Sequence, residues 1–260
     1  MVETLISEKN PLLKDVRRLA AGGAPAEDGL ALAEGPRLLE EALRSSIEIG
    51  AVILAESVSG IPHEDRLKGV RVARVPDAMF QKLASTESPQ GVLALVRLRT
   101  WKPQDLMKAT ALIAVLDGVQ DPGNAGTILR TAEAFGATGA IFLKGSVSPF
   151  NPKCLRASAG SAFRLPLLSG FAVESLLAMQ ASSKSGLTLY AADARAELAL
   201  GKAPLSGPCA IIIGSEGSGV QPKLAARATG LKIPTTTVES LNAAIAAGIL
   251  LYEARRQRTT

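Results

Sequence analysis

The chain has 260 residues, of which 47% are hydrophobic, 20% are charged and 3% are aromatic, and its formal net charge is +5. This composition excludes a disordered chain, a collagen-like repeat and a disulfide-rich scaffold, and it suffices for a sizeable core in one large or two ordinary domains. With one histidine, and with Cys154 far from Cys209, the sequence has no zinc-binding or C-x-x-C spacing, so we expect no metal site and two buried, unreactive thiols.

Neither a membrane span nor a secretory signal is expected. No apolar stretch reaches transmembrane length, and Glu3, Glu8 and Lys9 interrupt the apolar pattern of the first twelve residues. We therefore expect a soluble cytoplasmic protein.

Short β-rich runs alternate with helical patterns in the first hundred residues, which predicts an α/β layer. Asn10 and Pro11 mark the start of a helix with one apolar and one basic face. The predicted strands cover residues 30–33, 52–54, 70–75 and 92–96, and further predicted helices begin at residues 36 and 77.

The pattern breaks at residues 97–108, a polar stretch that contains Pro103 and has no apolar period. We therefore predict a domain over residues 1–100, a linker over 101–108 and a second domain over 109–260. In the second domain the predicted strands cover residues 112–116, 140–143, 187–191 and 210–213, and the predicted helices follow Gly123, lie near Lys153 and cover 173–180, 222–227 and 241–256.

Charge is spread unevenly between the two predicted domains. The net charge is −1 over residues 1–100 and +6 over residues 101–260, so the second half would attract a polyanion. Three arginines near the end, Arg255, Arg256 and Arg258, are explained equally well by the dipole of a C-terminal helix.

Three loops at predicted strand ends are candidate ligand sites, because ligands of open α/β sheets bind where strands meet the following helices. In the first loop, residues 117–130, Asn124 fits a helix N-cap. The side chains of Arg130 and Asn124 would point to the same place if Asn124 stands outside the helix. The alternative is that Asn124 only caps the helix and that Arg130 is a solvated surface charge.

The second loop, residues 214–219, reads GSEGSG and matches neither a dinucleotide fingerprint nor a P-loop. Its glycines would turn backbone amides toward a ligand, and we expect Glu216 to be held by hydrogen bonds. In the third loop, residues 233–242, Ser240 fits the N-cap of the last helix. The small residues of that helix suit an intersubunit contact and are explained equally well by core packing.

Taken together and in this order, these loops make the chain resemble the SpoU/TrmH family of RNA ribose 2′-O-methyltransferases. The three motifs of that family look like residues 124–132 (NAGTILRTA), 213–217 (IGSEG) and 240–242 (SLN). A further match to the family covers Asn151, Pro152, Lys153, Arg156, Ser158 and Gly160. The resemblance also extends upstream to the family's N-terminal substrate-binding domain. The matching residues there are Asn10 and Pro11, residues 34–38 (EGPRL) and residues 88–92 (SPQGV). The resemblance covers nearly the whole chain.

The resemblance implies a small α/β substrate-binding domain followed by an α/β methyltransferase domain of the SPOUT type, whose trefoil knot is an exception to the unthreaded topology of most chains. It also implies a homodimer and a bent S-adenosylmethionine bound in the knot. The implied cofactor-binding residues are Ala192, Gly214, Gly217, Ile233 and Leu241. Residues 235–239 depart from the family pattern, which often has Met and Gly there and is one residue longer.

The catalytic residues that the resemblance implies are Asn124, Arg130, Glu216, Ser240 and Asn242. In the family the arginine is proposed to take part in deprotonating the 2′-hydroxyl, but a guanidinium is charged at neutral pH and has no acceptor. We therefore expect Arg130 to bind the phosphate beside the target ribose and polarise the hydroxyl, while that phosphate or water accepts the proton. A purely structural role explains the other four residues as well.

Ribosomal RNA is expected as substrate ahead of transfer RNA, because the family's ribosomal RNA enzymes commonly carry such an N-terminal domain. Only nine aromatic residues are present, so phosphate contacts and shape, rather than base stacking, would carry RNA binding. Candidate contacts, each explained equally well as a solvated charge, are Lys14, Arg17, Arg18, Arg37, Lys153 and Arg156.

Two alternatives belong to other classes of function. A non-catalytic RNA-binding protein of the same fold would not need the full set of Asn124, Arg130, Glu216 and Asn242. A nicotinamide-dependent oxidoreductase would need a G-x-G-x-x-G turn followed by an acidic residue, which the chain lacks.

Overall fold

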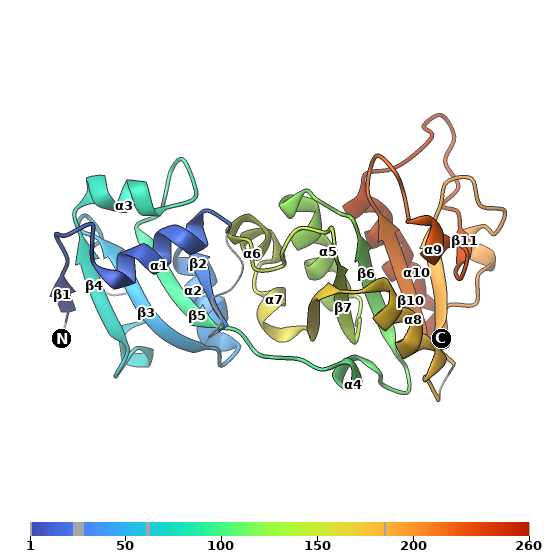
Figure 1. Cartoon of the computed structure of the whole chain (residues 1–260), viewed down its shortest axis with the longest axis horizontal. Helices are drawn as coiled ribbons and strands as arrows, with labels where there is room; N and C mark the ends of the chain where they lie inside the picture. Colours follow the sequence, from blue (N-terminus) through green and yellow to red (C-terminus); the bar gives the residue numbers. More distant parts are fainter. Residues whose placement is uncertain (1, 23–28, 61–62, 185, 260) are drawn as a thin grey trace. The chain divides into compact units, whose positions relative to one another are not determined.

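A computed structural model describes residues 2–22, 29–60, 63–184 and 186–259. The chain forms two compact units (Figure 1). Unit 1 consists of Met1–Thr100 and Phe150–Arg164, and unit 2 consists of Trp101–Pro149 and Leu165–Thr260. Among the described helices, none has the length and apolar character needed to cross a bilayer.

Unit 1 is built on a five-stranded mixed sheet with the order β1-β4-β3-β5-β2. Strand β5 runs antiparallel to both of its neighbours, and the other pairings are parallel. The strands are β1 (Val2–Thr4), β2 (Leu30–Glu34), β3 (Glu48–Ala55), β4 (Arg71–Val75) and β5 (Val92–Arg97). All four strands expected in this region are confirmed, while the short edge strand β1 is an addition.

Three α-helices from the first hundred residues pack on this sheet: α1 (Pro11–Ala20), α2 (Pro36–Arg44) and α3 (Asp77–Leu83). A 3-10 turn, η1, covers Glu64–Arg66. Helix α1 starts at Pro11, as expected, and Asn10 caps it, because the Asn10 side chain accepts from the amide of Leu12 at 3.0 Å. The apolar face of α1 and Phe80 of α3 enter one core cluster with alternate residues of the strands, such as Ile53.

Residues 150–164 return to unit 1 from the second half of the sequence as α6 (Pro152–Ser158) and α7 (Ser161–Arg164). Arg156 Nη1 lies 2.8 Å from Glu34 Oε2, and Arg164 Nη1 lies 2.7 Å from Glu41 Oε2. The expected domain limits place this segment in the second domain. The difference arises because partners more than 100 residues apart leave no local pattern in the sequence.

Unit 2 contains a six-stranded sheet with the order β11-β9-β10-β6-β7-β8, in which every pairing is parallel. Its strands are β6 (Leu112–Asp117), β7 (Gly139–Leu143), β8 (Leu167–Phe171), β9 (Thr188–Ala192), β10 (Cys209–Gly214) and β11 (Thr229–Leu231). Strands β6 and β10 are neighbours with Asp117 opposite Gly214, so the loops that follow them start side by side at one edge of the sheet.

The helices of unit 2 are α4 (Pro103–Leu106), α5 (Pro122–Ala134), α8 (Val173–Ala181), α9 (Pro222–Ala225) and α10 (Ala243–Arg258), with a 3-10 turn, η2, at Leu200–Lys202. Helix α10 packs against α5 and β10, as the drawing of unit 2 shows (Figure 1). The segment expected as a linker is partly packed: Leu106 of α4 is fully buried in the core of unit 2.

Candidate active site

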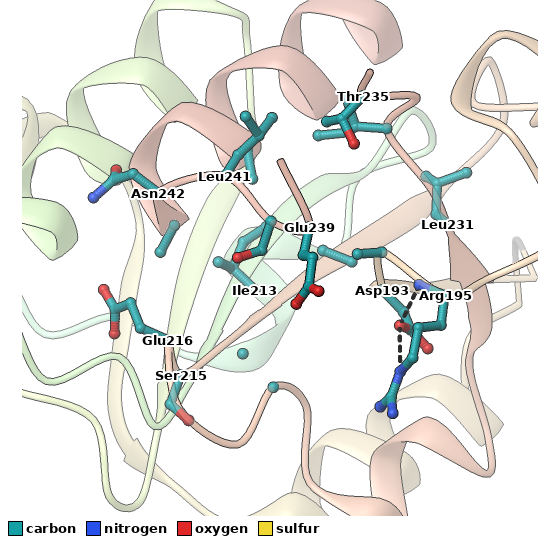
Figure 2. A pocket seen from close by; sticks show the side chains of 18 residues that line it. Asp193, Arg195, Ile213, Ser215, Glu216, Leu231, Thr235, Glu239, Leu241 and Asn242 are labelled. Atoms are coloured by element: carbon teal, nitrogen blue, oxygen red, sulfur yellow. Dashed lines mark hydrogen bonds and ion pairs between the residues drawn. The ribbon is translucent and has the colours of Figure 1, made fainter. Parts of the chain in front are cut away.

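The loops that follow β9, β10 and β11 line a cavity of about 450 Å³ in unit 2 (Figure 2). This volume lies in the range of small-molecule binding sites, and carboxyl ends of parallel strands are where such sites form. Four of the five predicted cofactor-binding residues line the cavity, namely Ala192, Gly214, Ile233 and Leu241. Gly217 belongs to the same loop as Gly214 but is not part of the lining.

Gly214 allows the second loop to fold back onto the end of β10. A Cβ atom at this position would lie 2.1 Å from the carbonyl carbon of Gly219 and 2.3 Å from the nitrogen of Val220, distances that no side chain tolerates. Ser215 and Gly219 exchange two backbone hydrogen bonds across the turn, at 2.9 and 3.1 Å. The cavity is therefore lined here by backbone, as a ligand held mainly by backbone groups requires.

Asp117 fixes the far end of this loop. Its carboxylate is buried and accepts from the backbone amide of Gln221 at 2.8 Å and from Gln221 Nε2 at 2.5 Å. Sequence reasoning did not single out Asp117 as a functional residue. The available signal was an acidic residue at the end of a strand that is otherwise fully apolar.

A polar network joins the three sequence motifs beside the cavity. Asn124 Nδ2 donates to Glu216 Oε1 at 2.6 Å, and Asn242 Nδ2 donates to Asn124 Oδ1 at 3.1 Å. Glu216 and Asn242 lie on the same side of the cavity in Figure 2. The expectation that Glu216 is held by a hydrogen bond is confirmed, and the donor is Asn124.

Both N-caps predicted in this region are wrong. Helix α5 is capped by Asp121, whose carboxylate accepts from the amide of Asn124 at 2.7 Å, so Asn124 lies in the first helical turn. Helix α10 is capped by Asn242, and Ser240 lies outside the helix. In the first case Pro122 starts the helix because its fixed φ suits the first helical position, which places the cap at Asp121, three residues upstream of Asn124.

The structure brings three of the five predicted catalytic residues into this network. Ser240 lines the cavity without joining the network. The side chain of Arg130 is exposed on α5, does not line the cavity, and makes no hydrogen bond or ion pair with any described residue. Its guanidinium is therefore available to an external anion.

The six predicted RNA-binding residues all belong to unit 1. Lys14, Arg37 and Lys153 are exposed, and Arg18 is exposed beside Asp15 at 3.6 Å. The other two are engaged within the unit: Arg17 Nη1 donates to the carbonyl of Glu8 at 2.7 Å, and Arg156 pairs with the buried Glu34.

The titratable side chains that line the cavity are Asp193, Arg195, Glu216 and Glu239. Arg195 Nε lies 3.8 Å from Asp193 Oδ1, and the amide of Arg195 donates to the same oxygen at 2.9 Å. Glu239 makes no hydrogen bond or ion pair with the described part of the chain, and Figure 2 shows its carboxylate facing the cavity.

The two thiols are buried, as expected, and burial raises the pKa of Cys209. The described residues hold no group of three or more His, Cys, Asp or Glu side chains arranged for a metal ion.

Two family models match the chain over separate ranges. Residues 111–252 match the SpoU rRNA Methylase family, and residues 10–94 match the MRM3-like substrate binding domain. The fold, the site and these matches define a two-domain methyltransferase with a SPOUT-type catalytic domain. The chain belongs to the SpoU rRNA methylase family.

Curated relatives resemble the chain over most of its length. It is 36% identical to an uncharacterised tRNA/rRNA methyltransferase of Synechocystis, over 99% of this chain and 95% of the relative. It is 32% identical to the 23S rRNA (guanosine(2553)-2′-O)-methyltransferase RlmP of Bacillus subtilis, over 96% of this chain and 98% of the relative.

Solved structures agree with this assignment. The crystal structure of an rRNA methyltransferase from Sinorhizobium meliloti superimposes with a TM-score of 0.85 at 30% identity and covers 98% of both chains. A structure described as the AdoMet-bound rRNA methyltransferase of the same organism gives the same TM-score at 29% identity.

Proposed function

We propose that the protein transfers the methyl group of S-adenosylmethionine to the 2′-hydroxyl of a ribose in structured RNA, and that this RNA is ribosomal. The observation that carries the proposal is the contact of Asn124 with both Glu216 and Asn242, which joins all three motifs beside the cavity. The named 23S rRNA 2′-O-methyltransferases among the relatives support ribosomal RNA as substrate. Because of that substrate, we place the reaction in the cytoplasm.

The cavity suits this cofactor. Backbone groups near Ala192, Gly214, Ile233 and Leu241 line it and would hold the adenine, while the side chains of Ile213 and Leu231 add apolar surface for the ring. The close approach of the Gly219 backbone at Gly214 supports a ligand held mainly by main-chain groups.

The proposed mechanism assigns positioning to the network and anion binding to Arg130. When bound, S-adenosylmethionine supplies an electrophilic methyl group on its sulfonium for in-line attack by a ribose 2′-oxygen. Asn124 fixes the position of the Glu216 loop relative to the start of α10 through its two side-chain hydrogen bonds. Ser240 and Asn242 shape the side of the cavity where the ribose enters. Arg130 binds the adjacent phosphate and polarises the 2′-hydroxyl, whose proton passes to that phosphate or to water.

We further propose a homodimer formed through α10. Ile245, Ile249 and Tyr252 are spaced along one face of the helix and are 56%, 37% and 54% exposed. Large apolar side chains exposed in one stripe are typical of an interface between subunits. The trefoil knot is proposed on the family resemblance, and it is supported by the path of residues 233–242, which lead from the edge strand β11 back to α10 beside β10.

RNA contacts are proposed on unit 1, which contains the match to a substrate-binding domain. Lys14, Arg18, Arg37 and Lys153 are exposed there. Arg17 and Arg156 contact groups of the unit itself, so their substitution would disturb both the fold and any RNA contact.

Calorimetric titration with S-adenosylmethionine, S-adenosylhomocysteine and NADH tests the cofactor part of the proposal. Binding of the two adenosyl compounds without binding of NADH is the expected result. Binding of NADH alone would favour an oxidoreductase. Binding of none of the three, with RNA absent and again with ribosomal RNA present, would overturn the proposal and favour a non-catalytic RNA-binding protein.

A further inference from the structure

Glu239 places an unpaired carboxylate at the proposed cofactor cavity. It belongs to residues 235–239, the stretch in which the sequence departs from the pattern of its family. Its side chain is exposed to the cavity and makes no hydrogen bond or ion pair with the described part of the chain (Figure 2). A carboxylate of this kind acts on a bound ligand mainly through its charge.

The charges that line the cavity are unbalanced. Three of the lining side chains are acidic, and Arg195 is the one basic side chain among the described residues of the lining. Arg195 pairs with Asp193, and Glu216 accepts a hydrogen bond from Asn124. Glu239 is thus the lining carboxylate that has neither a hydrogen-bond donor nor a cation as a partner among the described residues.

Methyl transfer changes the charge of the cofactor more than its shape. S-adenosylmethionine carries a sulfonium cation, an ammonium and a carboxylate, whereas S-adenosylhomocysteine has a neutral thioether in place of the sulfonium. The two molecules share every hydrogen-bonding group and differ by one methyl group and one positive charge. A side chain that binds one of the two more tightly than the other must therefore respond to the positive charge or to that methyl group.

We propose that Glu239 is a specificity-determining residue that favours the sulfonium form of the cofactor over the thioether product by electrostatic attraction. The inference rests on the proposed function and deepens it, since preference for the charged form would help the product leave after each turnover. Over several ångströms in a cavity open to solvent, one charge pair changes a dissociation constant by about 3- to 10-fold.

The test compares the wild-type protein with Glu239→Gln by calorimetric titration of three ligands. S-adenosylmethionine carries the sulfonium, sinefungin carries an amine in the corresponding position, and S-adenosylhomocysteine carries neither. We expect about a 3- to 10-fold weaker affinity for the first two ligands, about unchanged affinity for the third, and a smaller difference at high salt. Glu197→Gln is the matched control, because Glu197 is an exposed carboxylate that does not line this cavity.

Two results would overturn the inference while leaving the proposed function intact. An equal loss of affinity for all three ligands would show that Glu239 acts on a group they share, such as the ammonium. Unchanged affinity for all three would show that its charge does not act on the ligand. If the wild-type protein bound neither adenosyl compound, with or without ribosomal RNA, the proposed function itself would fail.

Discussion

Asn124 makes three different contacts with three groups of the site. Its backbone amide donates to Asp121, its side-chain amide donates to Glu216, and its side-chain oxygen accepts from Asn242. An aspartate at this position would lose the donor and place two carboxylates in contact. This explains why an amide side chain suits the position, whichever of these contacts serves catalysis.

Arg130 differs from Asn124, Glu216 and Asn242 because no described residue engages its guanidinium. We expect Arg130→Ala to lower kcat by about 10²- to 10³-fold, the typical effect of removing one group that stabilises charge in the transition state. Affinity for S-adenosylmethionine should be unchanged, because Arg130 does not line the cavity. Single-turnover methylation and calorimetry measure the two effects separately.

Arg130→Lys is the control for geometry, since it keeps the positive charge and removes the planar pair of donors. We expect it to recover little of the rate. Near-complete turnover with unchanged RNA affinity would show that a bidentate phosphate contact is not needed.

At the scale of the elements, local pattern predicted most of the strands and helices but not their ends. The apolar runs of β6 and β10 and the amphipathic α1 are strong periodic signals. The short strands β1 and β11 have three residues each, too few to show a period, and β8 contains Gly170. These strands form because neighbouring strands pair with them. The sequence of the segment itself does not show that pairing.

The site was predictable to the extent that its residues sit in motifs. The motifs identified Asn124, Glu216 and Asn242 but not which of them contact one another. These residues are about 90 to 120 positions apart in the sequence, and only the folded sheet brings them together. Asp117 was missed because its partner, Gln221, lies 104 residues away. Arg156 was assigned to RNA because its buried partner, Glu34, was not visible from the sequence.

The loop between β10 and α9 should depend on Asp117. We expect Asp117→Ala to weaken S-adenosylmethionine binding about tenfold, because the loop loses the two hydrogen bonds that hold Gln221 to the buried carboxylate, and ligand binding must then order the loop again at a cost of about 1.4 kcal/mol. Asp117→Asn should bind almost normally, since a reversed Gln221 amide restores both bonds. Gln221→Ala should add little to Asp117→Ala; additive losses by calorimetry would contradict a shared role.

The pair of Arg156 and Glu34 should stabilise unit 1. Removing one partner of a buried ion pair destabilises a protein by about 3–5 kcal/mol, and the partial exposure of Arg156 places Arg156→Ala at the lower end. Denaturant unfolding of the wild-type and variant proteins measures this loss. Unchanged stability together with weaker RNA binding would instead support the role first expected for Arg156.

For the whole molecule, the return of residues 150–164 changes how charge is distributed. The segment adds Lys153, Arg156 and Arg164 and no acidic residue to unit 1, whose net charge becomes +2 instead of −1. The unit that matches a substrate-binding domain is therefore mildly basic. This favours RNA recognition by shape and a few phosphate contacts over a strongly charged surface.

The proposed dimer predicts that a charge within the α10 stripe separates the subunits. We expect Ile245→Glu to convert the protein from a dimer to a monomer in size-exclusion chromatography with light scattering, because the stripe would be desolvated in the interface. Ile6→Glu, at an apolar side chain 79% exposed in unit 1, is the matched control and should leave the dimer intact. A wild-type monomer, or a dimer unaffected by Ile245→Glu, would contradict this interface.

The central claim is methyl transfer to a ribose 2′-oxygen of ribosomal RNA. The most direct measurement incubates the protein with S-adenosylmethionine labelled on the methyl group and with unmodified transcripts of ribosomal and transfer RNA, followed by alkaline hydrolysis. We predict label in ribosomal RNA that remains in alkali-resistant dinucleotides, because a methylated 2′-oxygen cannot attack the neighbouring phosphate. Label released in mononucleotides, or no label in any RNA, would contradict the account.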